Sequence, residues 1–295
     1  MSTTSKSPLA ILRTAHDVAR ATIPAYSHVN SPRKFTQHQL FACLVLKAAM
    51  KLEYRGLQAL LIDCSDLREA IELKAVPHWT AFQKAAARLL CDEHLADLLD
   101  RTLAGGPAST SQGAIDSTGM LTHHASSYYT RRRRETGDEG ARTHYHSYPK
   151  LSLLCDTANH QVLSCGMGQG PSPDIVEFQG LLRQAATRRR MRWITADAGY
   201  DSEPNHRLAR EDLGIRTAIP ATRGRPTLNG KPPKGRYRRL MTQRLNKERY
   251  GQRWQVETVM SMIKRRQGDS LWSRSQDGWN RDMGLMVLTH NILIP

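Results

Sequence analysis

The 295-residue chain is strongly basic, with 43 lysines and arginines against 27 aspartates and glutamates and a formal charge of +16. Such an excess recruits polyanions and favours nucleic acid or an acidic membrane surface as the partner. Five cysteines without a C-x-x-C pair argue against a disulfide framework or a zinc site and suit a reduced cytoplasmic protein. No signal peptide is evident and the apolar run 283–294 is too short to span a bilayer, so we expect no membrane partner.

The first 104 residues are expected to form an all-helical N-terminal domain. Thr36 is a good N-cap for an apolar helical stripe that begins at Leu40. Further helices are predicted at 54–61, 66–72 and 80–90, the last with Thr80 as its N-cap. Two short helices joined by a tight turn can form a helix-turn-helix that binds DNA ends, but a small helical bundle has the same periodicity.

The pattern becomes extended after a Gly/Pro/Ser-rich linker at 105–113. Predicted strands lie at 114–120, 150–156, 161–167, 192–196 and 216–220, and predicted helices at 174–188 and 203–212. Three strands followed by alternating helices and strands indicate an α/β fold with a sheet of mixed direction. We therefore place a second domain at 114–295.

Positive charge concentrates near the C-terminus. Residues 222–249 contain 10 lysines and arginines and a single acid, Glu248. Glycines and prolines among these cations predict a mobile loop at 221–245 that crosses DNA. Its predicted DNA contacts are Arg236, Arg238 and Arg239. Long helices are predicted on the C-terminal side, at 246–267 and 279–294.

Four residues within the first of these helices are spaced to share one face: Tyr250, Arg253, Glu257 and Lys264. At about 100° per residue, their side chains fall within an arc of about 60°. One carboxylate is then flanked by two cations and a phenol, which suits an acid that holds a metal ion beside DNA phosphates. An ordinary charge pair on a solvated helix face is the alternative for any single pair.

Two aspartates upstream, Asp116 and Asp197, lie at positions that favour a role in a site. Asp116 lies in the predicted strand 114–120, where it can also be a turn or capping residue, and Asp197 ends the strand 192–196 in Asp-Ala-Gly-Tyr-Asp. An acid at a strand end followed by glycine is a common site position in α/β sheets. We predict that Asp201, the second acid of that motif, caps the helix from Glu203 and stays outside the site.

The spacing Y-(2)-R-(3)-E-(6)-K and the two aspartate motifs, in this order, resemble bacterial insertion-sequence transposases of the DDE type over residues 35–295. The resemblance implies a ribonuclease H-like mixed sheet flanked by helices, whose central first strand neighbours the strand of the second acid. It implies that Asp116, Asp197 and Glu257 are catalytic and bind Mg²⁺ or Mn²⁺, with two ions per active site. Tyr250, Arg253 and Lys264 would contact DNA.

The expected partners are double-stranded DNA, as terminal inverted repeats and target, and further copies of the chain, because two ends must be handled together. Two alternatives remain open: a metal-dependent nuclease without strand transfer, and a non-catalytic DNA-binding protein or repressor, which would be expected to lack an acid. Arg131–Arg134 could touch DNA, although acids follow closely. Four histidines near this run lack zinc partners at standard spacings: His123, His124, His144 and His146.

Overall fold

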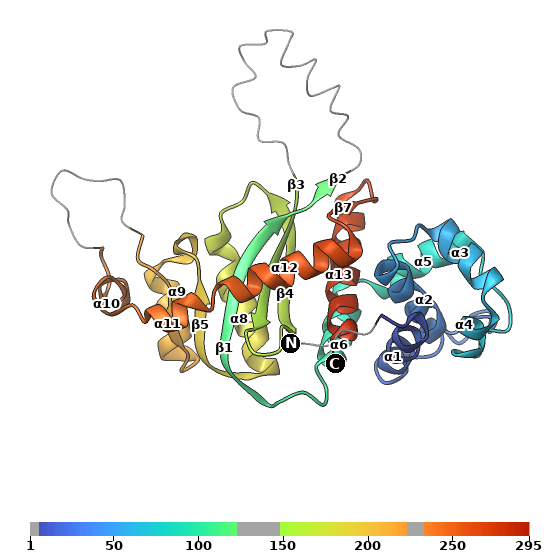
Figure 1. The fold of residues 1–295 in the computed structure, drawn as a ribbon, viewed down its shortest axis with the longest axis horizontal. Coiled ribbons are helices and arrows are strands. Elements are labelled where there is room, and N and C mark those ends of the chain that lie inside the picture. Colours follow the sequence, from blue (N-terminus) through green and yellow to red (C-terminus); the bar gives the residue numbers. More distant parts are fainter. Residues whose placement is uncertain (1–5, 123–147, 223–232, 295) are drawn as a thin grey trace, which may run out of the picture.

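A five-stranded mixed sheet forms the centre of the molecule (Figure 1). The computed structural model describes residues 6–122, 148–222 and 233–294. The strands lie in the order β4 (Val162–Gly170), β3 (Tyr148–Asp156), β1 (Ser109–Gly119), β5 (Arg190–Ala196) and β6 (Arg216–Ala218). The first three pair antiparallel, and β5 and β6 extend the sheet in parallel with β1. This topology confirms the ribonuclease H-like fold, with its first strand central.

Alternating side chains give the two faces of the sheet different neighbours. On β3, Leu153 packs in the cluster of α12 (Trp254–Gln267) and α13 (Gln276–Leu293), whereas Leu154 packs with α8 (Glu177–Arg188). On β1, Ala114 belongs to the first cluster and Ile115 to the second. The same alternation directs Asp116 toward the face that α12 crosses.

The N-terminal part is all-helical, as predicted, and begins with a helix that the sequence pattern did not indicate. Its helices are α1 (Pro8–Arg20), α2 (Gln37–Ala49), α3 (Tyr54–Asp63), α4 (Ser65–Glu69), α5 (Trp79–Leu89) and α6 (Asp92–Thr102). Thr36 is confirmed as an N-cap, in a capping box with Gln39. The prediction that Thr80 caps α5 is wrong, because the His78 side chain accepts from the Thr80 N–H and the helix already begins at Trp79.

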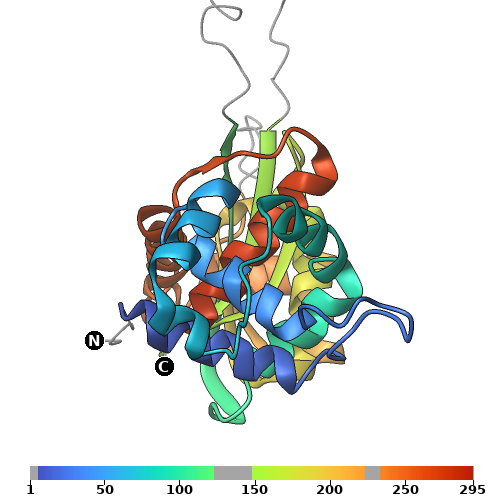
Figure 2. The same cartoon turned by 90° about the vertical axis from the view of Figure 1, so that its right-hand side faces the viewer.

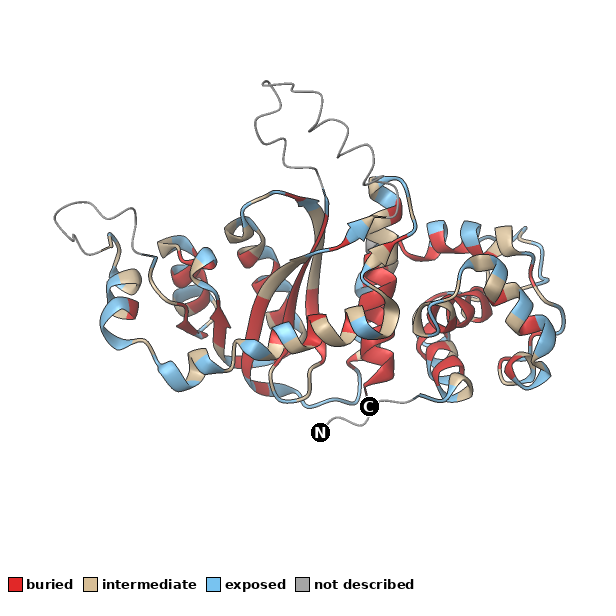
Figure 3. Ribbon diagram, turned by 45° about the horizontal axis from the view of Figure 1, so that its top comes forward, coloured by how far each residue is buried: buried red, intermediate tan, exposed pale blue. Residues whose placement is uncertain are grey.

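Helices α1 to α5 lie beyond α13 in Figure 1 and face the viewer in Figure 2, whereas α6 lies beside α13. One continuous hydrophobic cluster joins them to the sheet and includes Leu44 of α2, Val259 of α12 and Leu288 of α13. Figure 3 shows α13 buried along most of its length between the two parts. The division at 105–113 stays a prediction, but that segment is not all linker because β1 already begins at Ser109.

Two predictions near the C-terminus need correction. The predicted helix 246–267 is broken into α11 (Lys247–Gly251) and α12, with Gly251, a poor helix former, at the break. Shorter-range bonds tighten this junction: Arg253 N–H donates to Tyr250 O and Val256 N–H to Arg253 O. The predicted loop 221–245 contains the helix α10 (Arg236–Arg244).

Some predictions fall on residues that the structure does not describe. Arg131–Arg134 and the four histidines around them lie within 123–147, outside the described ranges. Within those ranges, no helix is long and apolar enough to cross a membrane. All five cysteines are described, and none is in a disulfide. A small two-stranded sheet of β2 (Leu121–Thr122) and β7 (Ser270–Leu271) joins the end of β1 to the segment after α12.

Candidate active site

Asp116 and Asp197 lie where the parallel pairing of β1 and β5 ends: Asp116 is inside β1, which continues to Gly119, and Asp197 directly follows β5. Ile115 of β1 pairs with Ala196 of β5, so the residue that follows each of them is the corresponding aspartate. Parallel strands end at the same edge of a sheet, where α/β proteins gather their sites. The residues 81 positions apart in the sequence are thus brought to one edge by strand pairing.

Glu257 reaches this edge from α12 through a shared arginine. Arg253 Nη1 lies 2.6 Å from Glu257 Oε1 and 3.5 Å from Asp116 Oδ2. The two carboxylate oxygens contact the same nitrogen, so they can be no further apart than the sum of those distances. The face of α12 that carries Glu257 therefore lies against Asp116 of β1. The Arg253 guanidinium bridges the two carboxylates.

The electrostatics of Asp116 favour a further positive charge. Burial raises its pKa above the ordinary value; the Ser117 N–H, 2.8 Å from Oδ1, and Arg253 oppose this rise, while Glu257 and Asp197 add to it. The pKa remains raised despite the arginine. Clustered carboxylates resist ionising together unless a cation compensates them, and a divalent metal ion supplies that compensation.

Asp197 is exposed and turned to its own backbone. Its carboxylate accepts from the Ala198 N–H at 2.6 Å and opens the 3₁₀ turn Ala198–Tyr200. Within the described ranges, no three His, Cys, Asp or Glu side chains are grouped closely enough to hold a metal ion. Three carboxylates at one edge still match the oxygen ligands that Mg²⁺ and Mn²⁺ prefer. To share an ion, Asp197 would turn toward Asp116, and Arg253 would leave its bridging position.

A half-buried hydroxyl cluster joins β1, β3 and the turn that follows Asp197. Ser117 Oγ lies 2.8 Å from Ser152 Oγ and 2.7 Å from the Tyr200 hydroxyl, and burial raises the pKa of that phenol. Tyr200 belongs to the Asp-Ala-Gly-Tyr-Asp motif, so the cluster links the segment after Asp197 to the residue after Asp116. The sequence patterns did not predict a role for Tyr200. Its place in the Asp-Ala-Gly-Tyr-Asp motif was the signal that could have indicated one.

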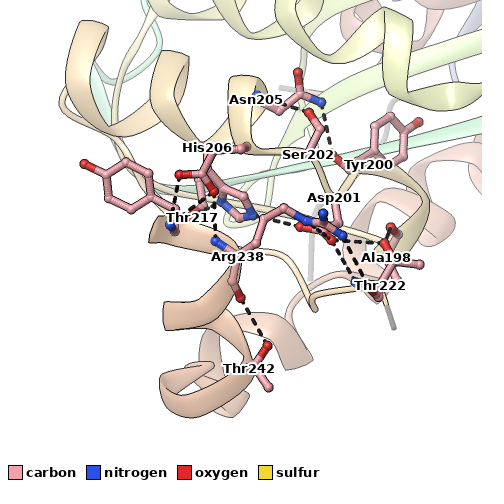
Figure 4. Close-up of polar contacts among 12 residues, drawn as sticks. Ala198, Tyr200, Asp201, Ser202, Asn205, His206, Thr217, Thr222, Arg238 and Thr242 are labelled. Carbon is pink, nitrogen blue, oxygen red and sulfur yellow. Dashed lines mark hydrogen bonds and ion pairs between the residues drawn. The ribbon is translucent and has the colours of Figure 1, made fainter. Parts of the chain in front are cut away.

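Asp201 anchors a second network, drawn in Figure 4, and the prediction that it caps α9 (Glu203–Arg207) is wrong. Its carboxylate is fully buried and contacts His206 Nε2 at 3.2 Å, Arg238 Nε at 2.8 Å and Thr222 N at 2.8 Å. Ser202 caps the helix instead. A buried carboxylate needs several partners, and His206, five residues on, was the only sequence hint of one.

The predicted DNA contacts on α10 have unequal surroundings. Arg238 is paired with Asp201, whereas Arg236 and Arg239 are exposed. The Glu203 carboxylate accepts from the backbone N–H groups of Tyr237 and Arg238 and fixes the start of α10. A basic helix is thereby attached to the chain segment that follows Asp197, and its contact with DNA stays a prediction.

The other two residues of the Y-(2)-R-(3)-E-(6)-K spacing, Lys264 and Tyr250, lie on different helices. Lys264 Nζ donates to Thr118 Oγ1 at 2.7 Å and to Gly119 O at 2.9 Å, at the end of β1 just beyond Asp116. Tyr250 lies half-buried on α11, before the helix break, so it does not share one continuous helix with the other three. Of the four residues in that spacing, Arg253, Glu257 and Lys264 therefore connect α12 to β1.

Comparison with known proteins identifies a family and a similar solved structure. The match to the family "Transposase DDE domain" spans residues 107–292, a range that contains all three acids. A structural match is a piggyBac transposase synaptic complex with hairpin DNA, with 10% identity, a TM-score of 0.41, and coverage of 98% of this chain and 73% of that chain. The family match covers more than half of the sequence, and the chain therefore belongs to the transposase DDE domain family.

Proposed function

We propose that the protein is the transposase of a bacterial insertion sequence, which cuts DNA and joins the 3′ ends to a target by in-line phosphoryl transfer. The observation that carries the proposal is the pairing of Ile115 with Ala196, which places the two aspartates that follow them on adjacent strands. Arg253 joins Glu257 to one of these aspartates, Asp116. Membership of the transposase DDE domain family supports the same reaction class. The bacterial cytoplasm is the proposed setting.

In this proposal Asp116, Asp197 and Glu257 hold two Mg²⁺ or Mn²⁺ ions. Bound ions of this kind activate water or a DNA 3′-hydroxyl and stabilise the departing 3′-oxygen. The raised pKa of Asp116 supports a role beside a cation. Arg253, released from the two carboxylates, grips a DNA phosphate in a bidentate manner. No covalent protein–DNA intermediate is required, so Tyr250 positions phosphate.

The proposed DNA surface continues from this edge along the basic segments. Arg236 and Arg239 are exposed on α10, where they would meet phosphates, while Arg238 contributes charge from its pair with Asp201. Lys264, whose amine donates to Thr118 and Gly119 at the end of β1, would contact the same substrate. The helical N-terminal part would bind the terminal inverted repeats, and a homo-oligomer would hold two ends together.

The test is a reaction of purified protein with Mg²⁺, a supercoiled target and labelled duplexes that carry the element's end. Joined product supports a transposase. Cleavage without joining indicates a metal-dependent nuclease, which would use the same three acids, and binding alone indicates a repressor. Retention of all three acids argues against the repressor.

Matched variants assign the reaction to the site. Asp197→Asn and Glu257→Gln should abolish joining, whereas Asp212→Asn, which alters an exposed carboxylate 4.0 Å from Arg183, should not. Unchanged joining in both site variants would refute the site assignment. Joining without added divalent metal, in the presence of a chelator, would refute the proposed chemistry.

A further inference from the structure

A pocket of about 550 Å³ opens between the N-terminal helices and the segment that connects α12 to α13. This volume lies within the range of pockets that bind small ligands. Its walls combine aromatic and cationic side chains from four helices and the segment after β7: Lys47, Tyr54, Arg55, Trp79, Trp272 and Arg281. The larger cavity beside α1, about 910 Å³, has no aromatic side chain in its described lining.

The aromatic groups of the pocket offer faces to a flat ligand. Trp272 is 66% exposed although it is one of the largest apolar side chains, and Trp79 is half-buried at the start of α5. The Arg55 guanidinium lies 5.1 Å from the Trp79 ring centroid. An indole with a guanidinium over it forms a stacking platform, on which a planar heterocycle can be held.

The charge of the pocket selects an anion. Lys47, Arg55, Arg274 and Arg281 line it, against only Glu53 and Asp282. A ligand that carries both a flat ring and a negative group satisfies both kinds of wall, and nucleotides are such ligands. Proteins that bind single-stranded nucleic acid combine basic grooves and stacking aromatics in this way.

We propose that this pocket binds one unpaired nucleotide of the DNA substrate, with its base stacked between the exposed Trp272 indole and the Arg55–Trp79 platform and its phosphate held by the arginines. The inference rests on the proposed function, because the nucleotide belongs to DNA held in the active site. The pocket adjoins β7, which follows α12 directly and pairs with β2 next to the end of β1. DNA that lies along α12 from Glu257 would pass this pocket.

The test compares single-stranded hexanucleotides that carry the same phosphates but differ in their bases. One has six ordinary nucleotides and the other is abasic throughout. Fluorescence anisotropy at one salt concentration gives the Kd of each hexanucleotide and of a blunt duplex. Wild-type protein should bind the base-bearing hexanucleotide about tenfold more tightly than the abasic one, because stacking requires bases.

Variants then locate the preference. Trp272→Ala, at a mostly exposed position, and Trp79→Ala should abolish it, while Trp79→Phe, which keeps an aromatic face, should retain most of it. Ile62→Ala, at an exposed apolar position on α3 outside the pocket, is the matched control. Blunt-duplex affinity should change little in all four.

Two outcomes would overturn the inference. If wild type binds the duplex yet shows no preference for bases, or if Trp272→Ala and Trp79→Ala both keep the preference, the pocket is not a nucleotide site and the proposed transposase function stands. If wild type binds no DNA at all, the proposed function fails together with the pocket.

Discussion

Two arginine–carboxylate pairs occupy opposite ends of β1 and serve different purposes. Asp156 and Arg189 meet at 3.0 Å near the start of the strand, and both side chains are almost fully buried. Asp116 and Arg253 meet at 3.5 Å near its end, with 20% and 26% of their side chains exposed. The buried pair has additional partners in Thr110 and Gln161, whereas the partly exposed pair shares its arginine with Glu257.

The buried Asp156–Arg189 pair stabilises the fold, whereas the partly exposed Asp116–Arg253 pair can exchange its partners. A buried pair that loses one partner leaves an uncompensated charge, so Arg189 cannot leave Asp156 without disrupting the sheet. A partly exposed arginine loses much less when it turns to solvent or to phosphate. The second arrangement therefore allows a metal ion to replace the guanidinium, as our account of the active site requires.

The largest expected effect is on catalysis. Neutralising Asp197 or Glu257, as Asp197→Asn or Glu257→Gln, should reduce Mg²⁺-dependent joining by about a thousandfold or more, because a metal ligand stabilises transition-state charge by several kcal/mol. The thermal midpoint should stay close to that of wild type, since both side chains are exposed. Loss of folded protein in either variant would remove the contrast with the Asp156 pair.

At the opposite end of β1, Asp156→Ala should lower the free energy of unfolding by about 3 to 5 kcal/mol, because Arg189 would be left buried without its carboxylate. Denaturant titration measures the change. Asp156→Asn keeps an oxygen for the Thr110 hydroxyl and should lose less. A loss below about 1 kcal/mol for the alanine variant would show that the two arginine pairs do not differ in kind.

Asp201→Ala should destabilise by about 2 to 3 kcal/mol at pH 7, less than Asp156→Ala because Arg238 is partly exposed. Burial alone would raise the pKa of Asp201, but hydrogen bonds from His206, Thr222 and Arg238 outweigh it and hold the pKa below the ordinary value. The stabilisation is therefore complete above pH of about 3.9 and is lost as the pH falls through the lower folded-state pKa. Thermal melts at pH 7 and near pH 3 should show the difference from wild type shrinking; a pH-independent difference would contradict this origin.

Arg253→Gln should tighten Mn²⁺ binding by DNA-free protein by about fivefold, because the guanidinium competes with metal for Asp116 and Glu257 through a partly exposed pair. Electron paramagnetic resonance of free Mn²⁺ measures the change. Weaker binding would mean that Arg253 supports the metal site instead of occupying it. DNA affinity should fall in the same variant.

The smallest effect is expected at Lys264. Lys264→Ala should weaken DNA binding about threefold and reduce the slope of log affinity against log salt by about one, with metal binding nearly unchanged. Lys264→Arg keeps the charge and should keep the slope. Because Lys264 also bonds Thr118 and Gly119, a change in Mn²⁺ affinity would reveal a structural role at the end of β1.

Much of the fold follows from local sequence patterns. Hydrophobic periodicity predicts the β3–β4 hairpin, α8, β5 and α13, and the spacing of Arg253 and Glu257 predicts their contact as helical neighbours. The position of Asp197 after a buried strand predicts its place at the sheet edge. These features depend on residues within a few positions of one another.

The missed features depend on contacts between distant segments. From its sequence position Asp201 is predicted to be a helix cap, because a helix begins at Glu203. Its partner Arg238 lies 37 residues later, beyond a segment without hydrophobic periodicity. The arginine that bridges Asp116 and Glu257 is 137 residues from Asp116, so no local pattern reports that Arg253 contacts both acids. The aromatic pocket joins α3, α5 and the α12–α13 connection and has no single sequence motif.

Mn²⁺ titration of DNA-free protein, followed by electron paramagnetic resonance, tests the shared metal site most directly. Our account predicts saturable binding by wild type and by Asp212→Asn, and a loss of at least about tenfold in affinity for each of Asp116→Asn, Asp197→Asn and Glu257→Gln. Wild-type affinity in all three site variants would contradict a metal site built from these acids.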